Sequence, residues 1–134
     1  MNIQHVLIEY IHQTWEQVEE YIKEGLTYAE GDYTLEQVKS LVATGQWMLV
    51  VALEGKNIKG AMTINFFNRP NDRVAFITTV GGKDIINKNT FSQLKELVVL
   101  CGATYMEVAG RDSVMRLLSR QGFKEKYRIA GVKI

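Results

Sequence analysis

Apolar side chains recur every three or four positions near the start of the chain, the spacing that places them on one face of a helix. That face consists of Leu7, Ile11, Trp15, Val18 and Ile22. Acidic side chains occupy much of the opposite side, which we expect to face water. Residues 2–6, just before this helix, form a candidate short strand.

A second helix is predicted to begin after Thr34. The Thr34 hydroxyl can accept from the amide of Gln37 while the Gln37 side chain reaches back, which is a capping box. Gly45 is expected to end this helix, because glycine readily adopts the left-handed backbone conformation found there. The first third of the chain is therefore predicted to be helical.

The middle third has the pattern of strands. Residues 47–53 form a continuous apolar run, typical of a strand buried on both faces, and a polar Gly-containing turn follows at 54–57. Residues 58–67 and 73–80 continue the pattern on either side of a turn at Pro70. These three segments predict antiparallel strands.

Helical spacing returns after residue 82, and Thr90 with Gln93 is read as a second capping box, opening a helix that Gly102 ends. A short strand is predicted over residues 103–108, then a helix capped by Asp112, then a final strand over 123–134. A strand–helix–strand crossover joins parallel strands, so we expect an α/β fold with a mixed antiparallel and parallel sheet covered by helices on both faces.

Length and composition limit the possibilities. A chain of 134 residues without an internal linker is expected to form one domain over residues 1–134. The net charge of +1 offers no general attraction for nucleic acid, and no apolar stretch is long enough for a membrane span, so neither is expected as a partner. Cys101 is the single cysteine, which excludes an intrachain disulfide, and no metal site is predicted.

The end of the chain carries a family resemblance. The strand 105–108, followed by a helix and then Gly122-Phe123, resembles the closing signature of GNAT acyl-CoA N-acyltransferases. More narrowly, the sequence is similar to GNAT-like proteins encoded by tailed bacteriophages. The short motifs that carry this narrower likeness are 47–49, Gly60-Ala61, Arg69-Pro70, Gly81-Gly82, Cys101-Gly102 and 107–111.

The resemblance implies a site for acetyl-CoA, should the chain be an enzyme. Family members bind the pyrophosphate with a glycine-rich loop at a helix N-terminus, next to a splayed strand, because unpaired amides attract anions there. Residues 83–90 contain no glycine. The candidate cofactor-binding residues are therefore Gly81, Gly82, Lys83, Thr90 and Arg111, the last standing where relatives carry asparagine. The alternative is that the two glycines serve an ordinary strand-to-helix turn.

Catalytic groups expected of the family are also missing. Leu118 stands where many members carry the tyrosine that protonates the departing thiolate, and no acidic residue lies in 74–80. The best catalytic candidates are Glu107 and Tyr105, which alternation places on one face of a strand. The alternative pairs Glu107 with Arg111 or Arg116, as an ion pair without chemistry.

Three features of the family are missing here: the glycine-rich loop, the tyrosine acid and the acidic base. Their absence favours a phage-type GNAT fold that has lost catalysis and acts as a virion structural or assembly component. It would contact a phage or host protein, or a second copy of itself, in the host cytoplasm or the virion, with no classical export signal. The alternative is an acetyl-CoA-dependent N-acetyltransferase with a non-standard active site. A phage-encoded inhibitor of a host factor is a third reading.

Overall fold

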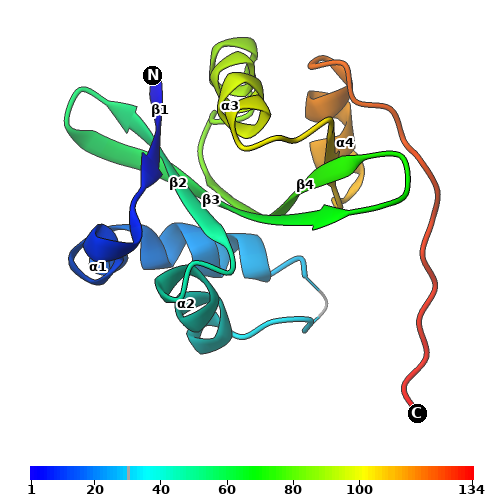
Figure 1. The fold of residues 1–134 in the computed structure, drawn as a ribbon, viewed down its shortest axis with the longest axis horizontal. Coiled ribbons are helices and arrows are strands. Elements are labelled where there is room, and N and C mark those ends of the chain that lie inside the picture. Colours follow the sequence, from blue (N-terminus) through cyan, green and yellow to red (C-terminus); the bar gives the residue numbers. More distant parts are fainter. Residues whose placement is uncertain (30) are drawn as a thin grey trace.

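The computed structural model describes residues 1–29 and 31–134. Helices and strands follow one another in the predicted order, except at the end of the chain (Figure 1). Their bounds are β1 Asn2–Val6, α1 Ile8–Leu26, α2 Leu35–Ala43, β2 Met48–Glu54, β3 Asn57–Asn68, β4 Arg73–Gly82, α3 Lys88–Leu100, β5 Tyr105–Val108 and α4 Asp112–Ser119.

The strands form one five-stranded sheet in the order β1-β2-β3-β4-β5. Neighbours from β1 to β4 are antiparallel, and β5 lies parallel to β4, with Tyr105–Val108 opposite Val74–Ile77. The predicted mixed sheet is confirmed. The register between β3 and β4 shifts at Thr63/Ile64, which leaves Thr78 as an extra residue on β4. Such a β-bulge bends its strand and increases the local twist.

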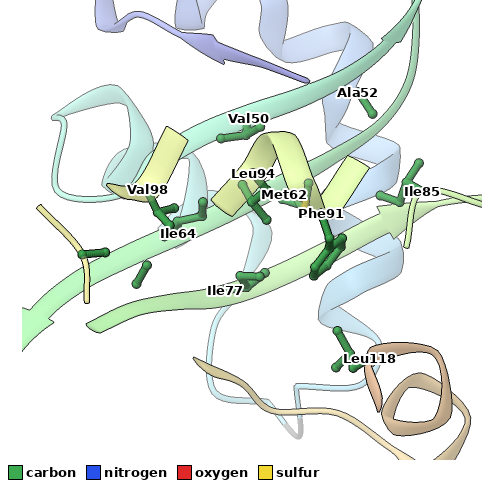
Figure 2. Close-up of a cluster of buried hydrophobic side chains, with 12 residues drawn as sticks. Val50, Ala52, Met62, Ile64, Ile77, Ile85, Phe91, Leu94, Val98 and Leu118 are labelled. Atoms are coloured by element: carbon green, nitrogen blue, oxygen red, sulfur yellow. The ribbon is translucent and has the colours of Figure 1, made fainter. Parts of the chain in front are cut away.

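Each face of the sheet has its own core. Helices α1 and α2 cover one face with buried Trp15, Val18, Ile22 and Val38. Helix α3 and the end of α4 cover the other, where Phe91, Leu94 and Leu118 meet apolar residues of β2, β3 and β4 (Figure 2). Among the helices that the structure describes, none is both long and apolar enough to cross a membrane.

The helix caps test the sequence prediction closely. The capping box of Thr34 and Gln37 is present. The second predicted box is wrong, because α3 begins three residues earlier and Asn87 caps it, accepting from the Thr90 amide at 2.8 Å. Gln93 instead binds the start of the chain, accepting from the Ile3 amide at 2.9 Å. The Gln93 side chain therefore binds the free edge of β1 and does not cap α3.

The cap of the last helix also differs from the prediction. Asp112 is the first residue of α4, and Arg111 takes the N-cap position without a side-chain hydrogen bond to the helix. Asp112 lies in the first turn, where a carboxylate interacts favourably with the helix dipole.

The final strand predicted over 123–134 is absent from the structure. After α4, Gly122 adopts a positive φ of 89° and turns Phe123 inward, where its ring lies 5.8 Å from that of Phe91. The chain beyond Phe123 runs extended and exposed along one side of the molecule (Figure 1). A final strand was expected here, but no strand in the described part of the chain pairs with these residues.

Candidate functional site

The parallel pair β4 and β5 separates at its carboxyl end. Pairing stops at Ile77 and Val108, whereas β4 continues to Gly82. The edge of β4 over residues 78–82 therefore has no strand beside it on the side of β5, and α3 and α4 both begin near this end. Carboxyl ends of parallel strands, with helix N-termini beside them, are where α/β proteins bind ligands. We refer to this region as the β4/β5 opening.

The two glycines at the end of β4 have a packing role. A Cβ on Gly81 would overlap the carbonyl oxygen of Tyr21 in α1, so the missing side chain lets α1 cross the sheet closely. Gly82 has a φ of +118°, and a Cβ there would lie 2.5 Å from the Lys59 oxygen. Its amide donates to the carboxylate of Glu24 at 3.2 Å. An anion at this amide would have to displace that carboxylate.

The N-terminus of α3 is better suited to an anion. Thr90 is buried and its amide is bonded to Asn87. The amides of Lys88 and Asn89 make no hydrogen bond within the described residues, as is usual for the first turn of a helix. The side chain of Lys83 is exposed nearby in sequence. The two free amides at the start of α3 therefore favour an anion such as a phosphate group, and Lys83 and Lys88 add positive charge nearby in the sequence.

The two catalytic candidates lie together on β5. Arg69 donates to both carboxylate oxygens of Glu107, at 2.7 and 2.8 Å, and Lys126 donates to the same carboxylate at 3.2 Å. These hydrogen bonds favour the charged form and hold the pKa of Glu107 below its ordinary value. Tyr105 is half-exposed, with the Lys126 ammonium 4.7 Å from its ring centre. Glu107 is therefore paired, although not with Arg111 or Arg116.

Arg111 lies at the start of α4 and points to the connection between α1 and α2. Its guanidinium lies over the ring of Tyr28, 3.7 Å from the centroid, which is the distance of a stacked cation–π contact. This contact joins the start of α4 to the residues that follow α1. Arg111 is also exposed, so its charge is accessible to a ligand there.

Three threonine hydroxyls meet at the bulge of β4. The Thr78 hydroxyl donates to the Thr63 carbonyl at 3.0 Å, so in the hydroxyl pair 2.6 Å apart Thr63 is the donor. The Thr79 hydroxyl, 2.7 Å from that of Thr63, is then free to donate to it. Each hydroxyl proton has one acceptor in this chain. The cluster consequently fixes the bulge and leaves no unpaired hydroxyl to act as a base.

Leu118 occupies the interior beside the opening. Its side chain is 1% exposed and belongs to the core cluster that also contains Phe91 (Figure 2). Phe123 packs at the margin of the same cluster. At the position where the resemblance implies a proton donor, this chain has a buried apolar side chain. A departing thiolate would find no acid at that position.

Two surface grooves are also present. One, of about 500 Å³, runs between α1 and the strands β1 to β3 and includes His5 and Tyr10. Partial burial lowers the pKa of His5. The other, of about 360 Å³, lies between α4 and residues 123–125. In the part of the chain that the structure describes, no three His, Cys, Asp or Glu side chains gather as a metal site.

Comparisons with known proteins bear on the fold. No family model and no curated protein matches the sequence. Solved structures match over nearly the whole chain, among them a probable acetyltransferase at 13% identity and a TM-score of 0.70, covering 100% of this chain and 97% of the other. The fold is GNAT-like.

Two other structures have the same GNAT-like fold. An aminoglycoside acetyltransferase from an uncultured soil metagenomic sample, in complex with sisomicin, matches with a TM-score of 0.72 at 12% identity, covering 99% of this chain and 94% of that one. A predicted acetyltransferase with acetyl-CoA, from Clostridium acetobutylicum, matches with 0.67 at 13%, covering 98% and 95%. The resemblance stated from sequence is thereby confirmed for the GNAT-like fold.

Sequence reasoning missed several partners at this site. Arg69 occurs in a short motif that assigns it no role, and no sequence pattern connects Glu24 or Tyr28 with the site. Glu24 lies 58 positions from Gly82, and no local pattern signals a contact across that separation. Arg69-Pro70 lies in the hairpin turn that leads to β4. Because β5 is expected to lie parallel to a neighbouring strand, this turn is the sequence signal that could place the positive charge of Arg69 near β5.

Proposed function

We propose that this protein is an N-acetyltransferase with a non-standard active site, which binds acetyl-CoA at the β4/β5 opening. The observation that carries the proposal is the fold, shared over nearly the full length with acetyltransferases that include an acetyl-CoA complex. The edge of β4 over residues 78–82, which has no strand beside it on the side of β5, supports it, because strand amides and carbonyls without a strand partner can bind an extended ligand.

Each part of the site has an expected role. The first-turn amides of Lys88 and Asn89, with the ammonium groups of Lys83 and Lys88, would hold phosphate oxygens. Bound acetyl-CoA supplies an activated acetyl group for transfer to an amine. Arg111 and Tyr28, which contact each other, would lie beside the opening where the acceptor amine enters.

Glu107 and Tyr105 remain the candidates for moving protons. A general base works best when its pKa is near the working pH. The pKa of Glu107 is instead lowered by Arg69, so Glu107 is a weak base while that pair is intact. We therefore expect slow transfer, and faster transfer only with acceptors that displace Arg69.

Calorimetric titration with acetyl-CoA tests the proposal. We expect a micromolar dissociation constant that weakens about tenfold or more in the variant Lys83→Glu/Lys88→Glu, since two favourable charges become repulsive. The matched control Lys56→Glu/Lys95→Glu changes two exposed lysines away from the opening by the same net charge. Equal weakening in both variants, or no binding at millimolar acetyl-CoA, contradicts the proposal.

The second candidate is a GNAT fold of phage type without catalysis, acting as a virion structural or assembly component through protein contacts. Buried Leu118 favours it, as does the Glu24 carboxylate on the Gly82 amide. A phage or host protein would be the partner. This candidate predicts no acetyl-CoA binding and a fixed copy number in purified particles, or in a complex with its partner, and absence from both would reject it.

A further inference from the structure

Glu107 binds two cations in different ways. Arg69 donates to both carboxylate oxygens, at 2.7 and 2.8 Å, in the bidentate geometry typical of a guanidinium. The Lys126 ammonium donates to only one of these oxygens, Oε2, at 3.2 Å. Two positive groups therefore share one negative charge, and the lysine makes the single and longer contact.

Arg69 is the fixed partner of the carboxylate. Its guanidinium lies 5.0 Å from the ring centre of Phe67, which is within the range of a cation–π contact. The ring of Phe67 lies in turn 6.3 Å from that of Phe76, the residue opposite Glu107 on β4. The contact with Phe67 and the bidentate bond thus hold Arg69 and the carboxylate in one orientation, without any contribution from Lys126.

Lys126 is the replaceable partner. Its side chain is 41% exposed, and its ammonium lies 4.7 Å from the ring centre of Tyr105, a distance at which the ring attracts a cation. An ion pair with an exposed lysine is weak, because holding the long side chain in one conformation costs entropy. Rotation of the Lys126 side chain alone vacates the carboxylate oxygen and the face of the Tyr105 ring together.

We infer that Glu107 and Tyr105 form a binding site for a primary alkylammonium group, which Lys126 occupies when no ligand is bound. The ligand ammonium would bind one carboxylate oxygen and the ring face, as that of Lys126 does. The site favours an ammonium over a second guanidinium, because Arg69 already takes the bidentate position and the contact that remains is to one oxygen. A lysine side chain, or a linear amine of similar length, has this chemistry.

The ammonium site lies at the β4/β5 opening. Glu107 is paired with Phe76, and the next pair, Val108 with Ile77, is the last before the two strands separate. In an acetyltransferase the amine bound here is the acceptor, a reading that rests on the proposed function. After the ammonium releases one proton to water, the C–N bond forms as the C–S bond of the thioester breaks, and the second proton lost by nitrogen goes to the departing thiolate.

Titration of the full-length chain with a capped lysine, blocked at its amino and carboxyl groups, tests the inference through the NMR shifts of the β5 amides. We expect a dissociation constant in the millimolar range that falls about fivefold in Lys126→Met, because a competitor within the chain is removed. The matched control Lys124→Met removes another exposed lysine nearby in sequence and should bind as the wild type does. Capped arginine should bind more weakly than capped lysine.

Two further variants locate the ligand. Glu107→Gln and Tyr105→Leu, each combined with Lys126→Met, should weaken the binding of capped lysine about fivefold or more, because each removes one of the two groups that attract the ammonium. Circular dichroism checks that both variants are folded. Tyr105 is 36% exposed, so Tyr105→Leu tests the site even where Glu107→Gln unfolds the protein.

Three results would overturn the inference: no lysine binding by any variant, equal affinity in the wild type and Lys126→Met, or shifts confined to residues outside β5. None of these titrations contains acetyl-CoA. Acetyl-CoA binding without lysine binding therefore rejects the ammonium site and leaves the proposed function standing. Lysine binding without acetyl-CoA binding rejects the acetyltransferase and leaves the ammonium site.

Discussion

Arg69 and Glu107 form a bidentate ion pair, with N–O distances of 2.7 and 2.8 Å. The pair joins the hairpin turn between β3 and β4 to the last strand of the sheet. Lys126 completes it from the end of the chain at 3.2 Å. Three segments far apart in sequence thus meet at one carboxylate that is 16% exposed.

Replacing Glu107 by glutamine should lower the free energy of unfolding by about 1–2 kcal/mol, because two partly buried charge-assisted hydrogen bonds weaken together. Urea unfolding measures the change. Glu125→Gln is the matched control, since Glu125 is 65% exposed and lies 3.6 Å from Arg128, a pair worth little in water. Similar losses in both variants would mean that the Arg69 pair adds no stability.

The same carboxylate predicts a pH dependence. The pKa of Glu107 is lower in the folded protein than in the unfolded chain, where it is near 4.5. A lowered pKa contributes stability above the unfolded value and loses it as the pH falls through the folded one. The stability difference between wild type and Glu107→Gln should be constant near neutral pH and shrink below about pH 4.5. A difference that shrinks near neutral pH would indicate another group.

Leu118 gives a prediction about the core. Leu118→Ala should destabilise the protein by about 2–5 kcal/mol, because it leaves a cavity beside Phe91. Leu117→Ala, at the neighbouring position with a side chain 39% exposed, should cost less than about 1 kcal/mol. Thermal unfolding of both variants measures this. A small loss at Leu118 would show that neighbouring side chains move in to fill the space.

The sequence predicted the fold well because its signals are local. The apolar spacing of α1, the capping box at Thr34 and the turn at Pro70 act over a few residues, and they appear in the structure. The exception is Leu7, which precedes α1 and is 47% exposed instead of lying on its buried face. The prediction for the end of the chain is wrong for the same reason, the local reach of these signals. The strand predicted over residues 123–134 does not form, because pairing depends on where α4 and Phe123 direct the chain, which no local pattern states.

The site was harder to predict than the fold. Alternation placed Tyr105 and Glu107 on one face of β5, yet the partner of Glu107 comes from a turn 38 positions earlier. Gly81 and Gly82 suggested a phosphate loop, whereas Gly81 is packed against the backbone of α1 and Gly82 against that of β3. Contacts between distant segments decide what a glycine or a carboxylate does, and one sequence does not reveal those contacts.

Gly81→Ala should destabilise the protein severely, by about 3 kcal/mol or more, because the new methyl group would overlap the Tyr21 carbonyl in the backbone of α1. Gly131→Ala is the control, since a Cβ at Gly131 meets no atom within 4 Å. Expression level and thermal unfolding measure both. An alanine tolerated at Gly81 would mean that α1 can move away from β4, and the two glycines would again be candidates for a phosphate loop.

Thr63→Val removes the central hydroxyl of the threonine chain while keeping the shape of the side chain. The Thr79 hydroxyl then loses its acceptor and Thr78 loses a donor, in a place where Thr63 is 0% and Thr79 3% exposed. Leaving a buried hydroxyl without its partner costs about 1–3 kcal/mol. Thr63→Ser keeps the hydroxyl and should retain most of the stability.

Amide hydrogen exchange should locate the effect of Thr63→Val. Because the hydroxyl chain joins β3 to the bulge on β4, exchange should quicken around residues 77–80 more than in β1 or β2. The bulge is also where β4 parts from β5, so a loosened bulge changes the shape of the opening. If exchange rises equally in all strands, the hydroxyls stabilise the sheet as a whole and do not hold the bulge.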